Sequence, residues 1–297
     1  MRLRWFVAAT LAAAACTPKP PPPIVITPTQ PPPGPVVVPP VAPPLPPPPA
    51  GAAAIRFGPS ALRYLVHRQI HTDQRIQGRT VTFDRGIRAY VSATILGPAD
   101  SVGYPVTLTI DSMAVDSGTY LPPNLDLAAV RGLRYQGRVT PAGELRGLTP
   151  SDSVLAWTAA QVFGTFQGFY PRLPPTGVTI GAEWSDSVTT VDRGMVEVKT
   201  TTISHSRAQG WEDRAGTKCL RLEVTAVFSL AGTGSMGGQP REVSGNGTRW
   251  TIHFIAGDGR YLGGEARDSL SITTTFPAEG ETVPGTQVSR ITVTVLP

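Results

Sequence analysis

Apolar and polar residues alternate along much of the chain that follows residue 60. In the first such run, the apolar residues Leu62, Tyr64, Val66 and Ile70 alternate with residues that include Arg63, His67, Gln69 and His71. Because side chains on a strand point alternately to its two faces, this spacing predicts a strand with one buried face. Similar runs occur at 106–110, 220–224, 250–254 and 291–295. Five or more such strands favour an antiparallel sheet with one buried face.

Glycine-containing segments between these runs predict the connections. The clearest are 84–86, 141–143 and 257–259, each of which combines a glycine with an acidic residue or a proline. Such composition is typical of tight turns, so we expect many strands to be joined as hairpins.

One segment follows a different period. Thr149, Ser151 and Asp152 offer helix caps, and the apolar residues after them recur at helical spacing until Gly168. We expect an amphipathic helix over 151–168 that covers the sheet. Its aromatic residues are interpreted first as plain core. The alternative is a pocket for an apolar ligand, lined by Trp157, Phe163, Phe166 and Trp184.

The chain also contains a weak internal repeat. Residues 133–147 and 249–263 share the order strand, turn, glycine, charge, apolar residue and glycine. This predicts two repeated halves, about 56–148 and 176–297, with the helix between them. The expected fold is mainly β: a large curved antiparallel sheet, a half-barrel wrapped around one central amphipathic helix, in a single domain over 51–297.

The first residues predict an export signal. Arg2 and Arg4 precede an apolar stretch of about ten residues, too short to span a bilayer, and small residues lead up to Cys16. Small residues directly before a cysteine resemble the bacterial lipobox. The resemblance implies cleavage after residue 15 and lipid attachment to Cys16. The alternative is an ordinary signal peptide with an unrelated cysteine.

Residues 18–50 hold 18 of the chain's 32 prolines, and Lys19 is their only charge. Such a segment lacks the side chains for a core and many amide donors, so we expect 16–50 to be a lipidated, extended linker. A docking sequence for proline-binding domains is the less favoured alternative.

Charge excludes one class of partner. Residues 51–297 carry 23 basic and 21 acidic side chains, and the arginines are scattered singly. No basic stripe matches a nucleic-acid backbone, so no nucleic acid is expected as a partner.

Motifs for chemistry are weak. His67 and His71 are four residues apart, which on a strand is about 13 Å and too far to chelate one ion. The glycines in 232–237 match a dinucleotide motif, but no helix follows, so we expect a flexible loop. Carboxylates stand singly in the sequence, and Cys219 is expected to be a packing residue. No enzyme activity, cofactor or metal is predicted.

Several short motifs together resemble an uncharacterised family of bacterial lipoproteins. They are the aromatic helix ending in 169–175, the following 178–184, the turn glycine of the repeated hairpin, and 216–222. The likeness spans most of 60–297 and implies an architecture similar to LolA/LolB-like and mycobacterial LppX-like lipid carriers.

These observations predict a non-catalytic envelope lipoprotein that binds a hydrophobic or lipid-like ligand. It would be anchored through Cys16, with the outer membrane facing the periplasm as the expected location, because Thr17 provides no acidic retention signal. The alternative is a structural or protein-interaction module without a small ligand, whose protein partner the sequence does not name.

Overall fold

The computed structural model describes residues 54–119, 126–193, 196–214, 216–236 and 239–297. These residues belong to one compact unit, Leu45–Pro297. The predicted signal peptide, Cys16 and the proline-rich linker lie outside the described residues.

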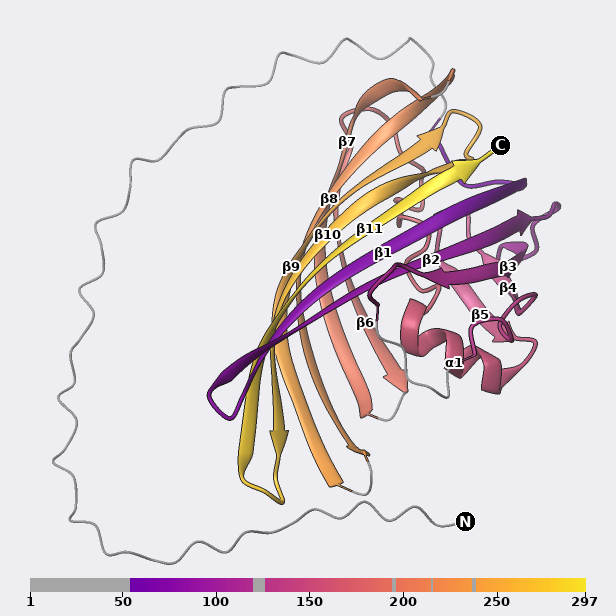
Figure 1. Ribbon diagram of the computed structural model, residues 1–297. Coiled ribbons are helices and arrows are strands. Elements are labelled where there is room, and N and C mark those ends of the chain that lie inside the picture. Colours follow the sequence, from indigo (N-terminus) through magenta and orange to yellow (C-terminus); the bar gives the residue numbers. More distant parts are fainter. Residues whose placement is uncertain (1–53, 120–125, 194–195, 215, 237–238) are drawn as a thin grey trace, which may run out of the picture. The chain divides into compact units, whose positions relative to one another are not determined.

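The described residues form one antiparallel sheet of eleven strands, which confirms the predicted mainly β class (Figure 1). The strand order is β5-β4-β3-β2-β1-β11-β10-β9-β8-β7-β6, so β5 and β6 form the two edges and the sheet is not closed. The strands are β1 (Ser60–Ile76), β2 (Arg79–Ile95), β3 (Tyr104–Val115), β4 (Arg134–Val139), β5 (Leu145–Pro150), β6 (Glu183–Arg193), β7 (Val196–Arg214), β8 (Thr217–Met236), β9 (Gln239–Ala256), β10 (Tyr261–Phe276) and β11 (Glu281–Leu296).

The structure does not show two repeated halves. Before the helix, β4 and β5 have 6 residues each, whereas after it the strands run from 11 residues in β6 to 20 in β8. The two hairpin turns that suggested the repeat are nevertheless alike. Gly143 and Gly259 take φ values of 87° and 86°, a left-handed conformation that favours glycine.

Two local predictions were wrong because glycines lie inside strands. Residues 84–86 belong to β2, and the turn before it uses Gln77 and Gly78 instead. Gly86 has no Cβ because the Asp116 side chain packs against its Cα. Residues 232–236 continue β8 rather than form a loop, and a Cβ on Gly232 would meet the Glu197 carbonyl oxygen at 2.5 Å.

The predicted helix exists but is shorter than expected. Helix α1 spans Ser153–Phe163, and the Asp152 carboxylate caps it by accepting from the backbone N–H groups of Val154 and Leu155. It ends early because Gly164 adopts a φ of 88°. The expected end at residue 168 was therefore wrong.

The core lies between the sheet and α1 together with the segment that follows it. Tyr64 is its centre, with the Phe169 ring at 5.3 Å and the Tyr261 ring at 6.0 Å between centroids. Its hydroxyl donates to the Tyr261 carbonyl at 2.9 Å, which satisfies the one polar atom of a buried side chain. The core therefore occupies only the part of the sheet near α1.

Candidate functional site

The register assigns side chains to two faces of the sheet. Paired residues project to the same face, and neighbours along a strand project to opposite faces. We call the face that carries Tyr64 and the core the inner face. The other is the outer face, which carries His67 and His71 on β1.

The four predicted ligand-binding aromatics do not gather in one place. Phe163 and Phe166 are together, 5.4 Å between ring centroids, and Phe166 is buried. Trp184 lies on the inner face of β6, half-buried, and its indole N–H donates to the Arg172 carbonyl at 3.1 Å. Trp157 is 46 % exposed on α1. The first three pack in or against the core, and their role in binding stays a prediction.

A group of polar side chains that the sequence pattern did not predict lies at the middle of the inner face. The four buried polar residues of the described part of the chain all lie there, in two adjacent cross-strand rows. With three arginines of the same rows they form what we call the polar band: Arg68, Arg85, Ser206, Arg249, Thr251, Asp268 and Ser289.

The centre of the polar band is an ion pair. The Arg249 guanidinium donates twice to the Asp268 carboxylate, at 2.6 and 2.9 Å, and the Ser289 hydroxyl donates to the same carboxylate at 3.1 Å. Asp268 is 9 % exposed at its side chain, while that of Arg249 is 45 % exposed. The Arg249 side chain is thus open to a ligand, whereas the side chain of its partner Asp268 is shielded.

Arg68 and Arg85 leave positive charge uncompensated. One Arg68 N–H group donates to the Phe163 carbonyl at 3.3 Å, and its buried Nε has no hydrogen-bond partner. Burial lowers the pKa of Arg68; Asp268 opposes this shift, and the charges of Arg249 and Arg85 add to it. Within the described ranges the exposed Arg85 forms no ion pair. Three arginines therefore face one carboxylate.

A half-buried histidine borders the polar band. The His253 ring Nδ1 lies 3.1 Å from the Tyr261 hydroxyl, and burial together with the Arg249 charge lowers the pKa of His253 to about 3. Burial raises the pKa of Tyr261 above its ordinary range. Both groups are therefore neutral near pH 7 and add no charge to compensate the arginines.

Beyond the polar band, away from α1, the inner face becomes apolar again. These side chains are half-buried, and in the described structure none of them belongs to the core cluster. We call them the open patch: Ile70, Phe228, Leu230, Leu270 and Ile272. They lie on β1, β8 and β10 in consecutive rows of the register, and glycines of β9 stand between the residues of β8 and β10. The polar band thus separates two apolar regions, and α1 covers one of them.

Glycines shape the open patch. A Cβ on Gly247 would lie 2.3 Å from the Ser269 carbonyl oxygen and 2.5 Å from the Phe228 ring, and one on Gly245 would lie 2.5 Å from the Ser271 carbonyl oxygen. Glycine at these positions lets the neighbouring strand and the Phe228 ring come close to the backbone.

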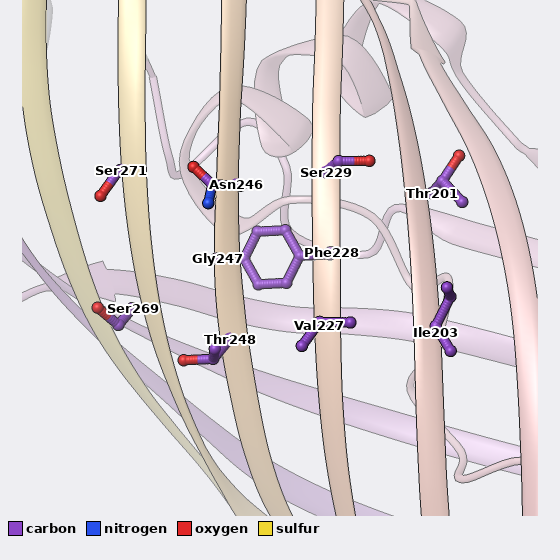
Figure 2. A pocket seen from close by; sticks show the side chains of 10 residues that line it. All are labelled: Thr201, Ile203, Val227, Phe228, Ser229, Asn246, Gly247, Thr248, Ser269 and Ser271. Carbon is purple, nitrogen blue, oxygen red and sulfur yellow. The ribbon is translucent and has the colours of Figure 1, made fainter.

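The outer face has a shallow depression of about 430 Å³ across β7, β8, β9 and β10. It lies on the opposite side of β8 and β10 from the open patch. Figure 2 shows Thr201, Ser229, Asn246 and Ser271 side by side across four strands, with Ile203 and Val227 in the next row. Six of the ten lining residues carry hydroxyl or amide groups, and Ile203, Val227 and Phe228 add apolar surface. The depression lies apart from the apolar pocket near α1 that was the alternative interpretation of the sequence.

Histidines of the outer face are paired with carboxylates. His67 Nε2 lies 2.7 Å from Asp116, and His71 Nδ1 lies 2.7 Å from Asp84. In the part of the chain that the structure describes, no three potential ligands gather into a metal site. Burial raises the pKa of the Cys219 thiol, and its Sγ donates to the Glu212 carbonyl at 3.3 Å.

Comparison with known proteins adds little. No protein-family model and no curated protein matches this chain. Among solved structures, a DUF1329 family protein from Desulfovibrio piger is similar at 9 % sequence identity, covering 78 % of this chain and 85 % of that chain, with a TM-score of 0.14. So low a TM-score supports no argument about function.

No helix among the described residues is both long enough and apolar enough to cross a membrane.

Proposed function

We propose that this protein is a non-catalytic binding protein for a hydrophobic or lipid-like ligand, which lies on the open patch of the inner face. The observation that carries the proposal is an apolar surface outside the core. Leu230 of β8 and Leu270 and Ile272 of β10 project on either side of the β9 glycines without joining the core cluster. Covering such a surface contributes roughly 25 cal/mol per Å² of apolar area removed from water.

The setting that we propose for this activity is the bacterial envelope. The lipobox-like sequence before Cys16 supports a lipid anchor, and the proline-rich linker supports a domain held away from the membrane. A half-barrel curvature of the long strands, similar to that of LolA/LolB-like and LppX-like carriers, would hold a ligand on the inner face. An outer-membrane location facing the periplasm belongs to the same proposal.

A second candidate function is protein interaction through the outer face. Ile203, Val227 and Val288 are exposed there by 56 %, 56 % and 53 % and share one cross-strand row. Exposed branched apolar side chains in one row of a sheet face favour contact with another protein. No small ligand is needed in this alternative.

Native mass spectrometry of the full-length protein, purified from a bacterial envelope fraction and released into the gas phase, tests the main proposal. A lipid-sized mass that accompanies the chain and is recovered by organic extraction supports it. A chain that carries no small molecule, and binds no apolar probe, contradicts it and favours the interaction module.

Two residues of β8, three positions apart, provide a matched pair of variants. Leu230 faces the open patch, whereas Val227 projects from the outer face. Leu230→Gln should weaken binding of a neutral fluorescent fatty ester about tenfold, because it places a polar amide in the ligand's apolar surroundings. Val227→Gln should leave binding unchanged. Equal effects of the two variants would argue against the inner face.

A further inference from the structure

We infer that the polar band recognises the anionic headgroup of an amphiphile, a carboxylate or a phosphate, whose chain lies on the open patch. The inference rests on the proposed function and adds the ligand's charge and orientation. It joins two observations that hydrophobic binding alone leaves unexplained: the excess of positive charge on the inner face, and its position at the border of the apolar surface.

The charges of the polar band do not balance. Across β1, β2 and β8–β11 its two rows contain Arg68, Arg85 and Arg249 against the single carboxylate of Asp268. Farther along the same rows, on β6, Asp186 is already paired with Arg172 at 2.8 Å. Two positive charges therefore remain for a ligand anion.

The donors point to an anion as well. Arg68 Nε is buried and has no acceptor, a costly state for a guanidinium that an incoming oxyanion would relieve. Arg249 already gives two N–H groups to Asp268, yet its side chain is 45 % exposed. Exposed Arg85 supplies further donors. Guanidinium groups match the planar oxygens of carboxylates and phosphates.

The order of the rows sets the ligand's orientation. Arg85 and Ile70 are partners in the register, and Leu270 and Phe228 lie in the next row away from α1. A headgroup on the polar band would thus place its chain directly over the open patch. The chain would point away from α1, because Tyr64 and the aromatic core fill the other side.

The test compares an anionic probe, dansyl-undecanoate, with its uncharged methyl ester. Full-length protein is held in nanodiscs of zwitterionic lipid, and empty discs are subtracted. The anionic probe should bind at least about tenfold more tightly than the ester, as expected for a charge-assisted hydrogen bond of about 1.5–3 kcal/mol. Equal affinity for both probes would overturn the headgroup inference and leave the proposed function standing. If neither probe binds, the proposed function itself fails.

Variants locate the headgroup. Arg85→Gln should weaken binding of the anionic probe about tenfold and leave the affinity for the ester unchanged, because only the acid interacts with the Arg85 charge. Asp268→Asn should tighten the anionic probe by removing the competing carboxylate, a gain that misfolding cannot imitate. Arg290→Gln on the outer face, where Arg290 pairs with Glu265 at 3.1 Å, is the control and should change neither probe.

A last arm separates an amphiphile from a free anion. Inorganic phosphate, added alone as a competitor, should displace dansyl-undecanoate only at concentrations at least about a hundredfold above those of a competing fatty acid, because it gains nothing from the open patch. Displacement by phosphate at the same concentration as by a fatty acid would contradict an amphiphile site.

Discussion

His253 is a side chain whose burial should make stability depend on pH. Its folded pKa is about 3, whereas a histidine in an unfolded chain has a pKa of about 6.5. Between these values the unfolded chain binds a proton that the folded chain does not. The free energy of unfolding should therefore fall as pH is lowered from 7, by at most about 1.4 kcal/mol per pH unit.

Urea unfolding at pH 7 and pH 5 measures this effect, and His253→Gln should reduce the difference between the two conditions. The hydrogen bond with Asp84 raises the pKa of His71, so this histidine stabilises the fold as pH falls. The effect is the same in the unmodified protein and in the His253→Gln variant. The lowered pKa of Asp116 acts mainly at more acidic pH. An unchanged difference in the variant would mean that His253 is solvated in the folded protein.

Individual site residues could be predicted only where they fitted a period. Helical spacing marked Phe163 and Phe166, and the structure packs them together in or against the core, while their role in binding stays a prediction. Arg68 was missed although it interrupts the apolar positions 62, 64, 66 and 70 of its own strand. Asp268 interrupts 266, 270 and 272 in the same way. An isolated charge at an apolar position was the available signal, but its partners come from other strands and only the register unites them.

Among the strands, β9 shows how glycine limits what an element can tolerate. Gly247→Val should lower the free energy of unfolding by about 1–3 kcal/mol, because its Cβ would approach the Ser269 carbonyl oxygen and the Phe228 ring. Gly58→Ala, where nothing lies within 4 Å of the added carbon, is the control. Denaturant unfolding of both variants gives the comparison, and equal stabilities would contradict the close packing described for β9.

At the scale of elements, the sequence predicted that strands form and that they pair antiparallel, but it did not predict where the strands end. Alternation predicted strands and the antiparallel class, since it reflects a face that is buried locally. Glycine was interpreted as a turn signal at 84–86 and as a loop at 232–237, whereas 84–86 and the described residues 232–236 lie in strands. The reason is that close approach of a side chain or of a neighbouring strand also requires glycine, and sequence does not separate these causes.

For the whole protein, the lipid anchor is the prediction with the widest consequence. Cys16→Ser should abolish incorporation of a labelled fatty acid in living bacteria and release the protein from the membrane fraction. Cys219→Ser is the matched control, since Cys219 is buried in β8 and should leave labelling unchanged. A Cys16 variant that remains labelled would show that lipid is attached elsewhere and that the lipobox interpretation is wrong.

The position of β11 affects how the sheet is assembled. It is the last strand in the chain, yet it lies between β1 and β10 and supplies the ladder that joins the block β5–β1 to the block β10–β6. Neither block pairs with the other through any other named strand of the described sheet. A chain leaving the ribosome must therefore wait for β11 before the two blocks can be joined. Such pairing between distant parts of a chain is slow, so β11 sets the time at which the whole sheet can be completed.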